Sequence, residues 1–355
     1  MRMEALLAIL ALALTAKSVT ALETVAPVPT GPTATVSNGQ LTATIALPDA
    51  DKGYYRGTRF DRSGIVISLK YRGHDYITPW SQIYDPAVED FEYRGDLIAT
   101  GQSATMVGVP EEFMTYPARL GLGWENAAVG KTFVKLGVGA LRKPDDKPYS
   151  HYRTYEVVEG SNWQVKQTAT SIAFTQTVAD LGSGYAYVYT KRIALAPGRP
   201  ELIMTHTLRN TGYKPIEGVV YDHNFMRWDN ETPGPDYSIH FAFEAKPNRP
   251  LGDKPLLVYN GHTVTFTHRL TDTEAIRSEP LGFSNNAKDY DFRVENAKLK
   301  IGLHIQADRP VTGMVIWGMR TAFALEPLIH YDIAPGADFS WKYDYQAYEL
   351  SSAAR

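Results

Sequence analysis

The chain has 355 residues, of which 44% are hydrophobic, with a formal net charge of −3 and no cysteine. The lack of cysteine excludes disulfides, thiolate catalysis and cysteine-ligated zinc. The near-neutral charge, without any block of Lys and Arg, argues against nucleic acid as a partner, because phosphate binding needs clustered basic residues.

The N-terminus has the pattern of a secretory signal peptide. Arg2 precedes an apolar run, Ala5–Ala16, and the small residues of Val19–Ala21 form a suitable cleavage site. A membrane anchor is less favoured, because the run is shorter than the span of about 20 residues that crosses a bilayer. We therefore expect residues 1–21 to be removed on export to the periplasm or the outside of the cell, with no membrane association afterwards. Residues 22–32 form a proline-rich leader.

From Thr33 onward the sequence is typical of β-strands. Asn38-Gly39 and Arg72-Gly73 stand between alternating runs and predict hairpin turns. Later segments are rich in Val, Ile, Thr, Tyr and Phe, with turn-forming residues between them. They include TSIAFTQTV, YAYVYTKRIAL, ELIMTHTLRNTG, TVTFTHRL, LKIGLHI, TGMVIWGM and DFSWKYDY. No linker divides residues 33–355, so the sequence predicts one all-β domain, a large sandwich or barrel.

Two short segments favour a helical turn instead. The first is Pro86–Leu97, and the second is Pro110–Pro117. The second begins with proline and places Glu111 and Glu112 where acidic residues stabilise the start of a helix.

Three polar positions are candidates for chemistry. The stretch Val219–Asn230 begins like a buried strand and breaks into Asp222-His223-Asn224 before returning to apolar residues. His151 ends a polar loop just before a strand, and Glu326 follows an apolar run. A buried carboxylate must be paired or hydrogen-bonded, and desolvation raises its basicity. Each position is either catalytic or a structural polar group, and no histidine pattern predicts a metal site.

Taken together, these segments resemble the aldose 1-epimerase (galactose mutarotase) superfamily over nearly the whole mature chain. THTLRNTGYKPIEGVVYDHNFMRW resembles the family's Asn-Thr-Gly turn and the strand that carries its catalytic histidine, with Asp222 in place of the usual Asn. FALEPLIHYDIAPGADFSWKY resembles the closing segment with the catalytic glutamate, and LRKPDDKPYSHYRTYEVV the loop with a second histidine. GYYRGTRFDRSGIVISLKYRGHDY resembles the opening hairpin. The resemblance implies a β-supersandwich of large antiparallel sheets, with the site in a concave face.

The implied reaction exchanges the α and β anomers of an aldose. Glu326 would remove the proton from the anomeric hydroxyl, His223 would protonate the ring oxygen, and His151 would polarise the same region. The ring would open to the aldehyde and reclose on its other face. This chemistry requires no metal and no organic cofactor.

The resemblance also implies residues that hold the sugar. Arg59, with Arg56 beside it, corresponds to the family's sugar-binding arginine, and Trp228 would line the sugar face. Asp222 would orient His223 or a substrate hydroxyl. Because adjacent strand residues point to opposite faces, Asp222 and His223 can enter one cleft only across a bulge, and otherwise Asp222 is structural.

Three other functions remain open on this scaffold. A polysaccharide lyase would use Arg and Tyr side chains, which Tyr54, Tyr55, Arg56 and Arg59 offer. A non-catalytic carbohydrate-binding module is favoured by the lack of a clear counterpart to the family's substrate-binding aspartate. An exported structural β-protein would bind no ligand. The sequence indicates neither the sugar nor the oligomeric state.

Overall fold

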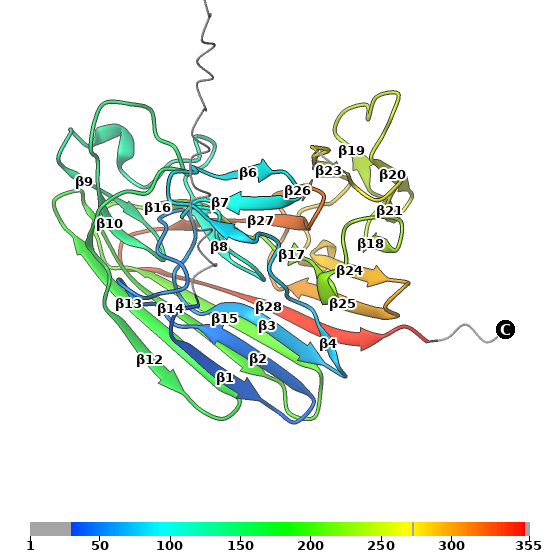
Figure 1. Cartoon of the computed structure of the whole chain (residues 1–355). Coiled ribbons are helices and arrows are strands. Elements are labelled where there is room, and N and C mark those ends of the chain that lie inside the picture. The colour runs from blue at the N-terminus through cyan, green and yellow to red at the C-terminus, as the bar shows by residue number, and fades with distance from the viewer. Residues whose placement is uncertain (1–29, 272, 352–355) are drawn as a thin grey trace, which may run out of the picture.

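The computed structural model describes residues 30–271 and 273–351, and its regular structure is almost entirely β-strand (Figure 1). The predicted signal peptide and most of the predicted leader lie outside these residues. No helix in the described ranges is long and apolar enough to cross a membrane. The described residues form three short 3-10 helices, η1 (Trp124–Asn126), η2 (Trp228–Asn230) and η3 (Ala287–Asp289).

Two large antiparallel sheets form the two layers seen in Figure 1. The lower, ten-stranded sheet has the order β12 (Trp163–Gln167), β13 (Ser171–Asp180), β14 (Tyr185–Leu195), β15 (Glu201–Asn210), β28 (Asp338–Glu349), β25 (Ile301–Ala307), β24 (Asp291–Asn296), β18 (Tyr237–Phe241), β21 (Thr263–Phe266) and β20 (Leu257–Asn260). The upper, six-stranded sheet has the order β22 (Ile276–Ser278), β26 (Gly313–Gly318), β27 (Phe323–Ile333), β16 (Ile216–Asp222) and β8 (Glu111–Met114), with β17 (Phe225–Met226) paired to β27.

Smaller sheets surround these layers. One contains β1 (Thr33–Ser37), β2 (Leu41–Ala46), β3 (Ile65–Tyr71) and β4 (His74–Asp75). The others contain β5 (Ile83–Tyr84), β6 (Phe91–Arg94) and β7 (Leu97–Thr100); β9 (Thr132–Lys135), β10 (Gly139–Arg142) and β11 (Val157–Glu159); and β19 (Lys246–Pro247) with β23 (Pro280–Leu281). The predicted all-β architecture of large antiparallel sheets is confirmed.

The apolar core fills the space between the two large sheets, because alternation along each strand gives each sheet one buried face. On β28 the side chains of Trp341, Tyr343 and Tyr345 are at most 1% exposed, while the residues between them turn away from the core. The Trp341 ring lies 5.9 Å from that of Phe113 on β8, measured between centroids. Aromatic contacts of this kind join the two layers.

The two predicted hairpin turns are confirmed, whereas the two predicted helical turns are wrong. Asn38-Gly39 connects β1 to β2, and Arg72-Gly73 connects β3 to β4 with both residues at positive φ. The segment Pro86–Leu97 instead contains β6 and the start of β7. The segment Pro110–Pro117 forms β8, because Glu111 and Glu112 are both fully buried and have partners on opposite faces of a strand.

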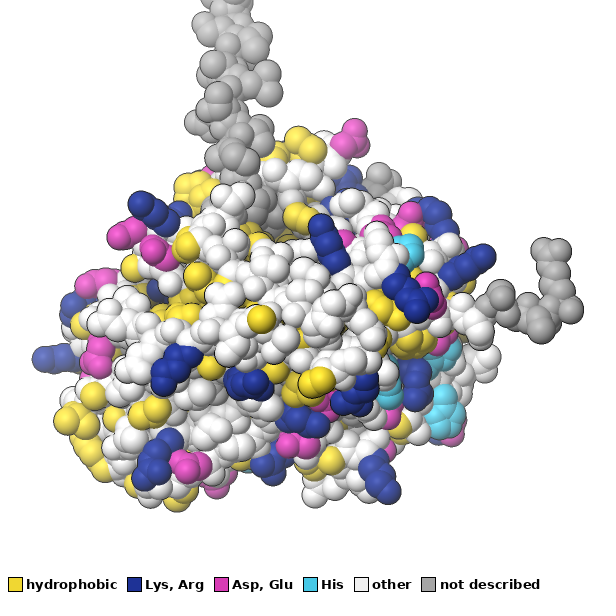
Figure 2. Space-filling view, turned by 90° about the horizontal axis from the view of Figure 1, so that it is seen from below, with side chains coloured by type: hydrophobic (Ala, Val, Ile, Leu, Met, Phe, Trp, Pro, Cys, Tyr) yellow, Lys and Arg dark blue, Asp and Glu magenta, His cyan; other side chains and the backbone are white. Residues whose placement is uncertain are grey.

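The surface seen from below in Figure 2 carries acidic and basic side chains that are interspersed rather than separated by sign. This arrangement agrees with the small net charge of −3. A nucleic-acid-binding face would gather Lys and Arg into a patch or stripe.

A buried ionic cluster links the two layers. The Lys191 ammonium of β14 lies 2.7 Å from Glu111 of β8 and 3.5 Å from the carboxylate of Asp61. His206 of β15 places its Nε2 2.9 Å from the same Glu111 oxygen. Burial alone would raise the pKa of the Glu111 carboxyl, but His206 and Lys191 reverse that effect and lower the pKa to about 2.

We expect Lys191→Met to lower the free energy of unfolding by about 3–5 kcal/mol, because it leaves two buried carboxylates without their ammonium partner. Urea denaturation followed by tryptophan fluorescence measures the change. Arg142→Met is the matched control, since it removes an exposed partner of Glu156 and should leave the free energy of unfolding nearly unchanged. Equal losses in the two variants would contradict a structural role for the cluster.

Candidate active site

The outer face of the six-stranded sheet carries a pocket whose empty volume, including the part open to solvent, is about 750 Å³. Strand alternation supplies its floor: Tyr221 of β16, Glu326 of β27 and Trp317 of β26 all project from this face. Loops before β3 and β11 supply Arg59 and His151. A pocket that combines aromatic rings with a few polar groups is the usual form of a small-molecule site.

His223 and Glu326 form a buried pair in this pocket. The His223 Nε2 lies 3.2 Å from the Glu326 Oε1, and their side chains are 6% and 10% exposed. Asn224 adopts a positive φ, which ends β16 and turns the chain toward β17. The imidazole is stacked on Phe225 with centroids 4.0 Å apart, and the Trp317 ring meets its edge. Apolar packing therefore fixes the ring against the carboxyl group.

Burial shifts the two pKa values in opposite directions. It lowers the pKa of His223 to about 3, with a further contribution from the positive charge of Arg59. It raises the pKa of Glu326 to about 8, although Arg59 and Arg277 act in the other direction. At neutral pH both side chains are uncharged, and the one titratable proton of the pair lies on Glu326.

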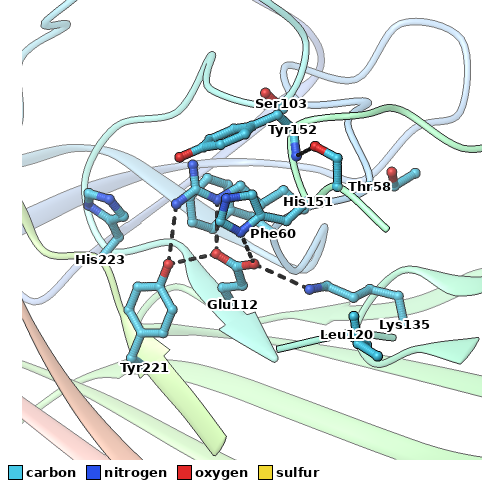
Figure 3. Close-up of polar contacts among 12 residues, drawn as sticks. Thr58, Phe60, Ser103, Glu112, Leu120, Lys135, His151, Tyr152, Tyr221 and His223 are labelled. Carbon is cyan, nitrogen blue, oxygen red and sulfur yellow. Dashed lines mark hydrogen bonds and ion pairs between the residues drawn. The ribbon is translucent and has the colours of Figure 1, made fainter. Parts of the chain in front are cut away.

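A second cluster is organised by the buried carboxylate of Glu112 (Figure 3). Tyr221 donates its hydroxyl hydrogen to Glu112 Oε2 across 2.6 Å, and Arg59 donates from Nε to the same oxygen across 2.8 Å. Lys135 Nζ and His151 Nδ1 each lie 3.3 Å from Glu112 Oε1. Burial would raise the pKa of the Glu112 carboxyl, but Arg59 and Lys135 hold it well below its usual range.

This arrangement orients the groups that face the pocket. Because the ionised Glu112 only accepts hydrogen bonds, the His151 Nδ1 beside it carries a hydrogen. The other ring nitrogen, Nε2, is not engaged by Glu112. The guanidinium of Arg59 lies over the Phe60 ring at 4.5 Å and over the Tyr152 ring at 5.2 Å, measured to the ring centroids. The two rings restrict its position on both sides.

The structure brings together four of the seven site residues expected from the sequence and places three elsewhere. His151, His223, Glu326 and Arg59 all line the one pocket. Arg56 donates to the backbone oxygen of Asp51 outside it. Trp228 is fully buried among core aromatic rings, with Tyr76 at 5.1 Å.

Asp222 faces the core rather than the pocket. The chain leaves β16 at this residue, and its side chain lies on the opposite side of the sheet from His223, as strand alternation requires. A hydrogen bond joins its carboxyl group to the Tyr345 hydroxyl. Burial and the nearby Glu111 raise the pKa of Asp222 well above its usual range, which favours the neutral carboxyl at this core position.

Several pocket residues were not expected from the sequence. Tyr152, Tyr221 and Trp317 line the pocket, and Glu112 is buried behind it as the hydrogen-bond partner of Tyr221. A signal existed for Glu112: two adjacent glutamates followed by Phe and Met also fit a strand with one acid on each face. Among the described residues, no group of three or more His, Asp or Glu side chains is placed to hold a metal ion.

Comparison with solved structures identifies the architecture. A galactose mutarotase related enzyme from Lactobacillus acidophilus is 13% identical over 90% of this chain and 100% of its own, with a TM-score of 0.52. A galactose mutarotase-like protein from Clostridium acetobutylicum is 12% identical over 89% and 95%, with a TM-score of 0.51. The chain has the galactose mutarotase-like fold. An aldose epimerase homologue from C. elegans, at 12% identity over 91% and 100% with a TM-score of 0.50, shares it.

The sequence-based resemblance is thus confirmed at the level of the fold. No protein-family model matches the chain, and no curated protein matches its sequence. Identities of 12–13% to galactose mutarotase-like structures show the fold alone. The residues of the pocket, rather than the fold, determine the chemistry.

The raised pKa of Glu326 gives a stability prediction. Between pH 4.5 and about 8 the folded protein keeps a proton on Glu326 that the unfolded chain releases. The free energy of unfolding therefore falls by about 1.4 kcal/mol for each unit of rising pH in this window. Glu326→Gln removes this dependence. We expect the stability of the variant relative to the wild type to rise across the window and to level off above pH 8, as measured by urea unfolding. A constant difference would contradict the buried, protonated carboxyl.

Proposed function

We propose that the protein is a mutarotase of the aldose 1-epimerase type, which interconverts sugar anomers by general acid–base catalysis. The observation that carries the proposal is the buried His223–Glu326 pair at 3.2 Å, in the same pocket as His151 and Arg59. Mutarotation needs one group to accept a proton and another to donate one, and such catalysis typically contributes about 10²–10⁴-fold. A pair that holds one proton meets this need.

The proton count defines how the pair would work. The resting proton lies on Glu326, and it crosses to His223 before Glu326 accepts the proton of the anomeric hydroxyl. His223 then protonates the ring oxygen as the bond from that oxygen to the anomeric carbon breaks. The open-chain aldehyde therefore faces a protonated Glu326 and a neutral His223, which is the resting arrangement. Rotation of the aldehyde group and reversal of both transfers yields the other anomer without net gain or loss of protons.

The rest of the pocket suits a pyranose. Trp80, Phe91 and Trp317 form an aromatic wall with edge contacts near 6 Å, suited to the C–H face of a sugar ring. Arg59 and His151, held by Glu112, offer hydrogen bonds to hydroxyl groups. The mixture of apolar surface and convergent polar groups supports a carbohydrate as the ligand.

The pocket favours this proposal over a polysaccharide lyase and over a non-catalytic carbohydrate-binding module. Of the residues offered for a lyase, Tyr54 and Tyr55 are buried in the core and only Arg59 lines the pocket. A module that only binds sugar has no need of a desolvated carboxyl with a pKa near 8, which is typical of catalytic groups.

We also propose that the protein acts outside the cytoplasm. The support is the N-terminal sequence alone, where Arg2 and the apolar run Ala5–Ala16 lead to small residues at a cleavage site. Mass spectrometry of the protein recovered from culture medium and periplasm, compared with the calculated mass of residues 22–355, tests cleavage and location together.

The mature protein should accelerate the optical-rotation change of freshly dissolved α-glucose, α-galactose or a related sugar or sugar acid. Glu326→Gln should lower kcat at least about 100-fold, because the carboxyl can no longer exchange a proton. Glu156→Gln, which alters an exposed glutamate paired with Arg142, is the control and should behave as the wild type. Relaxation of the whole panel at the buffer rate would disprove the activity, and an undiminished rate in Glu326→Gln would remove Glu326 from the mechanism.

The enzymatic rate should be flat from about pH 5 to 7.5 and fall roughly tenfold per unit above pH 8. In this range the pair first holds one proton and then loses it as Glu326 titrates near 8, while His223 gains a second proton only near 3. Polarimetry in a series of buffers, with the uncatalysed rate subtracted at each pH, measures the profile. A corrected rate that keeps rising through pH 9 would be inconsistent with a one-proton pair.

A further inference from the structure

A second pocket adjoins the first on the same face of the six-stranded sheet. Its empty volume, including the part open to solvent, is about 880 Å³. Arg119, Val315 and Leu328 line both pockets, so the two spaces are contiguous. No step of the proposed mechanism uses the second pocket.

The alternation of the strands places the two pockets end to end. Along β26, Trp317 lines the first pocket, Val315 lines both, and Gly313 lines the second. Along β27, Glu326, Leu328 and His330 follow the same progression. Residues two apart project from the same face of a strand, so each strand continues directly from the catalytic pair into the second pocket. From Glu326 to His330 this is about 13 Å at roughly 3.3 Å per residue.

The surface along this path has the mixed character of a sugar-binding groove. Its floor is a small apolar cluster, separate from the main core, of Met114, Val219, Tyr221 and Leu328. Polar groups stand around the second pocket, including Arg119, Glu279, Thr312 and His330.

Two apolar side chains at the second pocket are unusually open to solvent. Tyr116 is 60% exposed and Leu281 is 50% exposed. Exposed apolar surface rimmed by polar groups is typical of ligand-binding grooves. An exposed tyrosine offers both a flat apolar face and a hydroxyl group, which match the two kinds of surface on a sugar ring.

We propose that the second pocket binds the next sugar unit of a reducing oligosaccharide whose terminal ring lies between His223 and Glu326. The inference rests on the proposed function for the orientation of the ligand, since the anomeric carbon must face the pair. The following unit then extends from a distal hydroxyl of the first ring along β26 and β27. A monosaccharide fills only the first pocket and leaves the second to water. The preferred substrate class is therefore a disaccharide or longer chain with a free reducing end.

The test is direct binding by titration calorimetry, which does not depend on catalysis. Four pairs of monomer and dimer are compared: glucose with cellobiose, glucose with maltose, galactose with β-1,4-galactobiose, and galacturonate with its α-1,4 dimer. At least one dimer should bind the wild-type protein about tenfold or more tightly than its monomer. If no dimer binds more tightly than its monomer, the proposal is wrong.

Two variants test whether the tighter binding of the dimer depends on the second pocket. Gly313→Trp places a large side chain in the second pocket. Its Cβ would have the Leu328 side chain as nearest neighbour, at ordinary contact distances from 3.7 Å, and the φ of Gly313 lies outside the left-handed region. Tyr116→Ala removes the exposed ring. Each should reduce the dimer-to-monomer affinity ratio toward one. Tyr213→Ala, which alters a tyrosine that is 63% exposed and lines neither pocket, should keep the wild-type ratio.

The outcomes separate this inference from the proposed function. A ratio that survives in both Gly313→Trp and Tyr116→Ala would overturn the second sugar site, even if mutarotation is observed. Tighter binding of a dimer that depends on both positions would support the site, even if no sugar of the panel shows faster relaxation of optical rotation. In that case the groove would remain and the catalytic proposal would fail.

Discussion

The carboxylate of Glu112 is the interaction on which the candidate site depends. It is fully buried and binds Arg59, Lys135, His151 and Tyr221, which come from separate loops and strands. An isolated charge at this depth would be costly, so loss of its partners would destabilise the fold. The same contacts place a guanidinium and an imidazole at the wall of the pocket. Stability and the arrangement of the site therefore have a common source.

Strand alternation divides the polar residues between the core and the pocket. Glu111 and Glu112 are adjacent on β8, yet the first joins the ionic cluster with Lys191 and the second organises the pocket. Asp222 and His223 divide in the same way at the end of β16. Two layers of buried polar groups thus lie on opposite faces of one sheet. Asn224 connects them, since it accepts a hydrogen bond from Tyr345 and donates one to the backbone oxygen of Leu325, the neighbour of Glu326.

The sequence was sufficient for the fold class and for the residues whose local pattern is distinctive. His223 and Glu326 interrupt apolar runs, and the all-β architecture follows from alternation and turn residues. Glu112 was not found, because adjacent glutamates after a proline also fit a helix start, and the strand is decided by long-range pairing with β16. Trp228 was expected at the sugar face because local sequence cannot distinguish an aromatic ring that lines a pocket from one that packs in the core.

The electrostatic balance at the His223–Glu326 pair follows from these contacts. The positive charge of Arg59 lowers the pKa of both His223 and Glu326, whereas the negative charge of Glu112 raises both. Glu112, 2.8 Å from Arg59, opposes the effect of the guanidinium on both groups, and burial is the largest influence on the pair. An unpaired Arg59 would favour an ionised Glu326 and remove the shared proton at lower pH. Glu112, which holds Arg59 in place, therefore also preserves the one-proton state that the proposed acid–base catalysis requires.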